Sequence, residues 1–192
     1  ADALLERFGS LEALALRTPD FPAVLGSAAH CFALWWWQRR DTRYLQLARA
    51  MVARWNELPQ RPAALEPWFS PALALLAIAD GNRTAMEEWH DCADPPSAYG
   101  RVFPGRGTLR GLVDEALGRP EEALEHFDAE MTEVAVSPML WSGAAFERAR
   151  LLTELGWPGA EEAVDEVLEV TTRIGMRRWQ EKALALKKIL KA

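Results

Sequence analysis

The sequence predicts an all-α fold in which pairs of antiparallel helices are stacked one after another. Three observations support this prediction. Alternating β-branched stretches, which are typical of strands, are absent. A pattern of small residues, a turn and further small or aromatic residues recurs along the chain. Prolines and glycines gather in a few segments, and these separate the helical pairs from one another.

The clearest copy of the pattern is GLVDEALGRPEEALEHF, which contains Gly111, Gly118, Ala123 and Phe127. Small residues let the two helices of a hairpin approach closely, and the turn glycine ends the first helix. The aromatic side chain fills the gap between one hairpin and the next. This arrangement is the spacing of a tetratricopeptide repeat.

Three further segments carry the same pattern, with turns at Arg40, Gly81 and Gly156. The four turn positions, 40, 81, 118 and 156, are 41, 37 and 38 residues apart. This spacing is longer than the ~34 residues of a tetratricopeptide unit. We therefore expect a tetratricopeptide-like α-α superhelix of about four helical hairpins. The last segment, MRRWQEKALALKKIL, is expected to form a C-terminal capping helix.

The connecting segments contain most of the prolines. They are RTPDFP (17–22), ELPQRPAALEP (57–67) and DCADPPSAYGRVFPGRG (91–107). Proline ends helices, so these segments are expected to link hairpins. No shift in composition marks a second domain, and residues 1–192 are expected to form a single helical-repeat domain.

Composition and charge exclude several classes of protein. The net charge of −6 and the pI of about 5.2 give nucleic acid no general attraction. Two cysteines suit a reducing cytosol, and no apolar run approaches the ~20 residues that a membrane span needs. The first residues lack a signal-peptide pattern and an initiator methionine. We therefore expect a cytoplasmic fragment of a larger protein.

Three consecutive tryptophans, Trp35, Trp36 and Trp37, stand in the first hairpin. Successive helical residues point ~100° apart, so the three side chains cannot share one face. Trp36 is expected in the core and Trp35 against an adjoining helix. Trp37 is a candidate contact, which would then be exposed in a groove, and the alternative is burial under a neighbouring helix or loop.

The stripe that contains Trp37 is expected to continue along the first helix of each hairpin and to line a binding groove. The candidate binding residues are His30, Leu34, Trp37, Trp68, Leu75, Leu112, Glu115, Phe146 and Arg150. A largely apolar groove with a few polar points suits an apolar helix or a small apolar effector. The alternative is that the superhelix closes on itself and fills the groove with its own side chains.

Other groupings of reactive residues are weak. His30–Cys31 and His90–Asp91–Cys92 lack zinc-finger spacing, and a Glu-x-x-His pair, Glu87 and His90, occurs once. We predict no metal site.

The GRGTLRG stretch lacks the Lys-Ser/Thr end of a phosphate loop. A helix start near Pro104 and close helix packing explain its glycines better. Arg101, Arg106 and Arg110 could hold an anion there.

The chain resembles the C-terminal helical-repeat region of large bacterial signalling ATPases, including cyclase-linked and LuxR-type regulators. The matching stretches are AYGRVFPGRGTLRGLVDEALGRPEEALEHFDAEM, FERARLLTELG and LEVTTRIGMRRWQEKALAL. The resemblance covers residues 25–190. It implies a tetratricopeptide-like fold, and it implies no catalytic residues because the ATPase, cyclase and DNA-binding segments are missing.

The sequence therefore predicts a non-catalytic protein–protein interaction or sensor module that regulates a larger cytoplasmic signalling or transcription-regulatory protein. Its expected partner is another protein or another domain of its own parent. The alternative is a small-molecule effector-binding domain with an apolar, tryptophan-lined groove. No cofactor is expected. An enzyme is disfavoured, because three histidines and no triad-like motif leave little acid–base chemistry.

Overall fold

The computed structural model describes residues 13, 21–59, 69–91 and 104–191. Every regular element within these residues is an α-helix, so the all-α prediction is confirmed. The chain divides into two compact units, Ala1–Tyr99 and Gly100–Ala192, and each is described by itself. No helix in the described ranges is long and apolar enough to cross a membrane.

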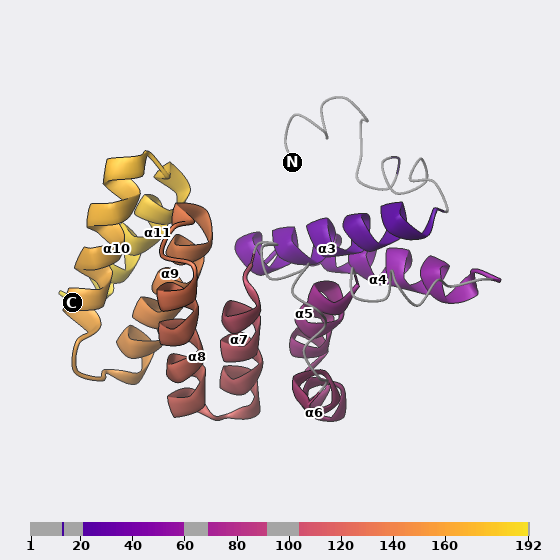
Figure 1. Ribbon diagram of the computed structural model, residues 1–192, viewed down its shortest axis with the longest axis horizontal. Helices are drawn as coiled ribbons and strands as arrows, with labels where there is room; N and C mark the ends of the chain where they lie inside the picture. Colours follow the sequence, from indigo (N-terminus) through magenta and orange to yellow (C-terminus); the bar gives the residue numbers. More distant parts are fainter. Residues whose placement is uncertain (1–12, 14–20, 60–68, 92–103, 192) are drawn as a thin grey trace. The chain divides into compact units, whose positions relative to one another are not determined.

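Among the described residues of the first unit, α3 (Pro22–Arg39) and α4 (Thr42–Glu57) form a hairpin (Figure 1). Arg40 ends α3 in the left-handed conformation (φ 56°) and donates its backbone N–H to the Trp36 carbonyl. Asp41 then begins α4, because its side chain accepts a hydrogen bond from the Arg43 N–H. The turn therefore lies at the predicted position, with an arginine where glycine is usual.

The second pair of helices in this unit is α5 (Ser70–Asp80) and α6 (Arg83–Asp91). Asn82 begins α6 by accepting a hydrogen bond from the Ala85 N–H. Helix α5 packs against α3 as well as α4, so α3 is covered on more than one side. Trp89 of α6 donates its indole N–H to Ser70 at the start of α5, which ties the two helices together.

In the described part of the second unit, residues 104–191, five helices lie side by side (Figure 1). They are α7 (Arg106–Leu117), α8 (Pro120–Glu133), α9 (Pro138–Leu155), α10 (Ala160–Ile174) and α11 (Arg177–Leu190). Each packs against the next, and α9 also contacts α7 and α11. Helices α7, α9 and α11 thus form one row, which we call the first-helix row. The predicted final helix is α11.

Small and aromatic residues pack together within the α7–α8 hairpin, whereas the aromatic side chain was expected between one hairpin and the next. Phe127 of α8 is fully buried, and its ring lies against Gly111 of α7. A Cβ atom added to Gly111 would stand 2.3 Å from that ring, which is closer than van der Waals contact allows. Ala149, Ala163 and Val167 are buried at the corresponding positions of the next hairpin. The small residues therefore set how closely the helices approach.

Candidate functional site

The predicted groove residues of the first unit are largely buried. Trp37 is 4% exposed and Leu75 is fully buried, whereas His30 and Leu34 are partly exposed. Trp68 lies outside the described residues. The expectation that Trp37 is exposed is therefore wrong, and the alternative of burial holds. The reason is tertiary, because α3 is packed by both α4 and α5.

The other two tryptophans lie as expected. Trp36 is buried. Trp35 is partly exposed and meets Tyr44 of α4 edge to face, with ring centroids 5.5 Å apart. A second edge contact joins Trp35 to Phe32 at 5.7 Å. The triple tryptophan is thus mainly a packing feature of the α3–α4 hairpin.

In the second unit the structure brings two predicted groove residues together. The guanidinium of Arg150 on α9 binds the carboxylate of Glu115 on α7 with both terminal nitrogens, one of them at 2.8 Å. Glu115 and Arg150 are partly exposed, while Leu112 and Phe146 are buried beside them. Two hydrogen bonds from one planar group fix the geometry of a carboxylate strongly. The ion pair therefore links two members of the first-helix row.

Arg150 also binds two further carboxylates. Its Nε donates to Glu147 at 2.7 Å, and its Nη1 donates to Glu154 at 2.7 Å. Glu154 is exposed, but the side chain of Glu147 is only 3% exposed. We call Glu115, Glu147, Arg150 and Glu154 the arginine cluster.

Burial and charge shift the pKa values in the arginine cluster in opposing ways. Burial raises the pKa of Glu147, and the charge of Arg150 only partly offsets this effect. Burial acts to lower the pKa of Arg150, but the charges of Glu147 and Glu115 outweigh it and raise the pKa. The guanidinium therefore stays charged, and its carboxylates keep their positions around it.

An aromatic pair lies next to the arginine cluster. Phe146 of α9 and Trp179 of α11 have ring centroids 5.2 Å apart. The ammonium of Lys182 lies 5.0 Å from the Phe146 ring and 4.9 Å from the Trp179 ring. A cation over a ring face is attracted by the ring quadrupole. The first-helix row thus carries fixed charges of both signs beside the buried rings of Phe146 and Trp179.

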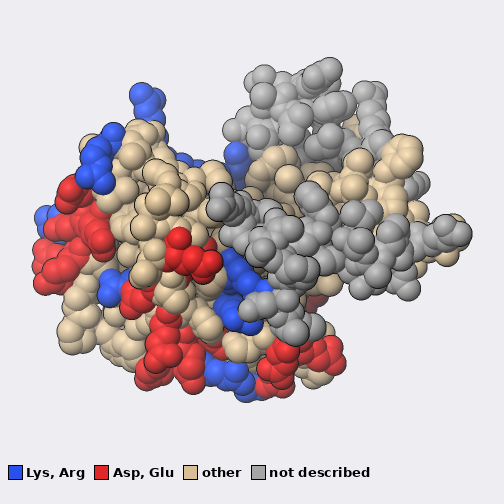
Figure 2. All heavy atoms as spheres, in the orientation of Figure 1, with Lys and Arg blue, Asp and Glu red and all other residues tan. Residues whose placement is uncertain are grey.

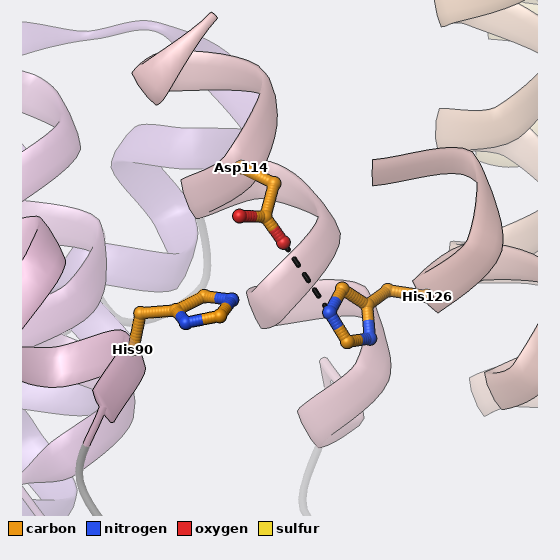
Figure 3. A group of neighbouring side chains, drawn as sticks. All are labelled: His90, Asp114 and His126. Carbon is orange, nitrogen blue, oxygen red and sulfur yellow. Dashed lines mark ion pairs between the residues drawn. The ribbon is translucent and has the colours of Figure 1, made fainter. Parts of the chain in front are cut away.

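Sequence reasoning missed a buried carboxylate in the α7–α8 hairpin. Asp114 is 1% exposed, and its Oδ2 lies 3.3 Å from Nε2 of His126 (Figure 3). Arg119 approaches the other carboxylate oxygen at 3.6 Å. One feature of the sequence could have revealed it, because Asp114 lies on the core face of α7, between Gly111 and Leu117. A buried charge of this kind requires partners, so Asp114 holds α7 to α8.

Two residues of the reactive groupings named from the sequence, His90 and Glu87, have charged neighbours in the structure. His90 belongs to the first unit, where its Nδ1 lies 3.7 Å from Asp91. Glu87 forms an ion pair with Arg83 at 3.0 Å. Cys92 lies outside the described residues. Asp114 and His126 of the second unit offer two ligand atoms, fewer than a structural zinc site uses.

The glycines of the GRG stretch make room for Glu130 of α8. The Gly107 N–H donates to Glu130 Oε2 at 2.6 Å, at the start of α7. A Cβ atom on Gly105 would stand 1.7 Å from the other carboxylate oxygen. The position expected for an external anion is thus taken by an internal carboxylate, while Arg101 lies outside the described residues. A helix start and close helix packing therefore explain the glycines of this stretch better than an anion-binding loop does.

No protein-family model, curated protein or solved structure matches this chain. Function must therefore be argued from the side chains of the chain itself. The richest arrangement within the described residues is the first-helix row of the second unit, where the arginine cluster adjoins the aromatic pair.

Proposed function

We propose that the chain is a tetratricopeptide-like, non-catalytic interaction module that regulates a larger cytoplasmic signalling protein. The antiparallel hairpins, the left-handed turns and the small-residue packing of Gly111 against Phe127 support this proposal. The observation that carries it is the first-helix row, on which the arginine cluster and the aromatic pair lie side by side. The resemblance to repeat regions of bacterial signalling ATPases belongs to the same proposal.

The chemistry of the row favours binding over catalysis. Three carboxylates are held by one guanidinium, and the nearby ammonium lies over two rings. Such groups are fixed in place and present a shaped, charged surface. The exposed carboxylate of Glu154 and the partly exposed Glu115 are the groups that a partner would meet first. Regulation would follow by occlusion, when a partner or another domain of the parent covers this row.

Photocrosslinking tests this function. Benzoylphenylalanine replaces Glu154 on the row or, as a control, Val136 in the turn between α8 and α9, which is 94% exposed. Irradiation of cells that contain the parent protein should give a discrete protein adduct from position 154 and none from position 136. Adding Glu115→Lys should reduce the adduct at position 154. Equal labelling from both positions would count against a binding function for the row.

The alternative, an effector-binding domain, is favoured by one observation in the first unit. A hollow of about 230 Å³ is lined by Val52, Trp55, Asn56, Phe69 and Leu73. Trp55 and Phe69 pack with their ring centroids 4.3 Å apart. The tryptophan of this hollow is Trp55, whereas the predicted groove contained Trp37 and Trp68. An apolar probe such as anilinonaphthalene sulfonate should bind saturably and raise the melting temperature. Leu73→Trp should fill the hollow and abolish both effects.

A further inference from the structure

The outer face of α11 carries exposed apolar residues among basic ones. Leu184 is 46% exposed and Ile189 is 63% exposed. Arg177 and Lys188 are exposed on the same helix, Lys191 follows its last residue, and Glu181 is the one exposed carboxylate of this face. The opposite face packs into the unit through Trp179, Ala183 and Leu186. The outer face of α11 is therefore partly apolar, and exposed apolar patches rimmed by charged residues are typical of interaction surfaces.

Helix α8 presents an exposed face of the same geometry and opposite charge. The exposed positions of α11 are 177, 178, 181, 184, 185, 188 and 189, and those of α8 are 121, 122, 125, 128, 129, 132 and 133. The spacing is identical, so both sets cover the same width of helix. The α8 set contains five carboxylates and no basic residue. They are Glu121, Glu122, Glu125, Asp128 and Glu133.

Helix α10, which packs against α11, is also acidic. It is less available to a second copy, because one of its carboxylates already binds α11. Asp165 of α10 binds Lys187 of α11, and Glu169 of α10 lies 3.9 Å from Arg173. Of the five carboxylates on the exposed face of α8, only Asp128 takes part in an ion pair among the described residues, with Arg148 at 2.6 Å. Figure 2 shows acidic side chains gathered over α10, at the left of the view, with basic side chains above them.

We propose that copies of this chain associate head to tail, with the outer face of α11 in one copy docked on the acidic face of α8 in the next. Charge complementarity selects the partner, and the contact buries Leu184 and Ile189. A contact between two different faces leaves one of each face open. Association therefore continues into chains or closes into rings. This surface is separate from the arginine cluster and from the function proposed above.

A second copy fits α11 better than a membrane or a nucleic-acid duplex does. Helix α10 packs directly against α11 and exposes Glu161, Glu162 and Glu166. An extended anionic surface would meet these carboxylates and be repelled. The net charge of −6 also opposes general binding to anionic polymers.

Sedimentation velocity of the whole chain tests the proposal. The sedimentation coefficient should rise with protein concentration at low ionic strength and fall back as salt is added, because exposed charges are screened. Ile189→Glu and, separately, Arg177→Glu with Lys188→Glu should abolish the rise. Val136→Glu, which changes an exposed apolar residue elsewhere, should leave it unchanged. Circular dichroism would verify that each variant is folded.

Reversing charge on α8 identifies the other half of the contact. Glu121→Lys with Glu125→Lys should also abolish association, although α11 is untouched. If the α11 variants abolish association but the α8 variant does not, the head-to-tail arrangement is overturned. A wild-type chain that stays monomeric throughout would overturn self-association. So would a monomer that binds phosphatidylserine vesicles or a DNA duplex through α11.

Discussion

Glu130 shows how a buried acid can position a helix at some cost in stability. Its carboxylate accepts the Gly107 N–H at the start of α7. Burial nevertheless raises the pKa of Glu130, and Glu133 adds repulsion, so the ionised form is disfavoured overall in the folded state. Burial and hydrogen bonding therefore act in opposite directions on the pKa of Glu130.

The raised pKa predicts a pH-dependent effect of Glu130→Gln. A folded-state pKa above the unfolded value means that the charge costs stability at neutral pH. This cost disappears below the unfolded pKa, about 4.3. Glutamine keeps an oxygen for the Gly107 N–H and carries no charge. The variant should melt at a higher temperature than the wild type at pH 7, and the difference should vanish on acidification.

Glu130→Ala is the matched control for that experiment. It removes the acceptor and leaves the Gly107 N–H without the carboxylate. We expect a loss of ~1–3 kcal/mol in the free energy of unfolding. A glutamine variant as unstable as the alanine variant would show that the negative charge itself is needed to hold the start of α7.

The burial of Trp37 changes what its removal should do. Trp37→Ala opens a cavity in the first unit, so it should lower the free energy of unfolding by ~3–5 kcal/mol, as should Trp36→Ala. Trp35 is partly exposed, and Trp35→Ala should cost less. Acrylamide quenching gives a second measurement, because only replacement of Trp35 should remove readily quenched emission. A stable Trp37→Ala variant would contradict the burial.

At the scale of elements, Arg150 holds α7 to α9. Removing the guanidinium leaves the buried carboxylate of Glu147 without its main partner. Arg150→Leu should therefore cost ~3–5 kcal/mol, whereas Arg150→Leu combined with Glu147→Leu should recover most of the loss. Urea unfolding of the two single variants and the double variant measures this coupling. Additive losses would mean that the two side chains act independently.

The same cluster shows what element packing adds to a sequence pattern. Helical register predicted that Glu115 and Arg150 belong to one face of consecutive first helices. The direct contact of α7 with α9 turns that shared face into an ion pair. The association of Lys182 with Phe146 and Trp179 depends likewise on the packing of α11 against α9.

For the whole molecule, the two units predict how the chain unfolds. Each unit has its own buried core, with Trp36 in the first and Phe127 in the second. Differential scanning calorimetry should resolve two transitions. Phe127→Ala should lower the temperature of one, and Trp36→Ala should lower that of the other. One transition that both variants shift would favour the single domain predicted from the sequence, which stays a prediction.

The sequence by itself determined the helical class and the places where the chain turns. Arg40, Gly81, Gly118 and Gly156 all end helices in the left-handed conformation, at the predicted positions. These features are local, because a turn depends on the conformational freedom of a few neighbouring residues. The close approach of two helices at Gly111 was also predicted, since the hairpin brings together residues that are close in sequence. Phe127 was expected between hairpins, but its ring lies against Gly111 of its own hairpin.

Only the tertiary structure decided which faces are covered and which charges meet. Helical register placed Trp37 on a separate stripe but could not show that α3 is covered by α5 as well as α4. The contacts of Glu130 with Gly107 and of Arg150 with Glu115 join residues 23 and 35 positions apart. Such pairs depend on how the helices are packed, and helical periodicity describes each helix alone. Whether a side chain is buried depends on the elements that pack around it, and the position of the residue in the sequence does not give this information.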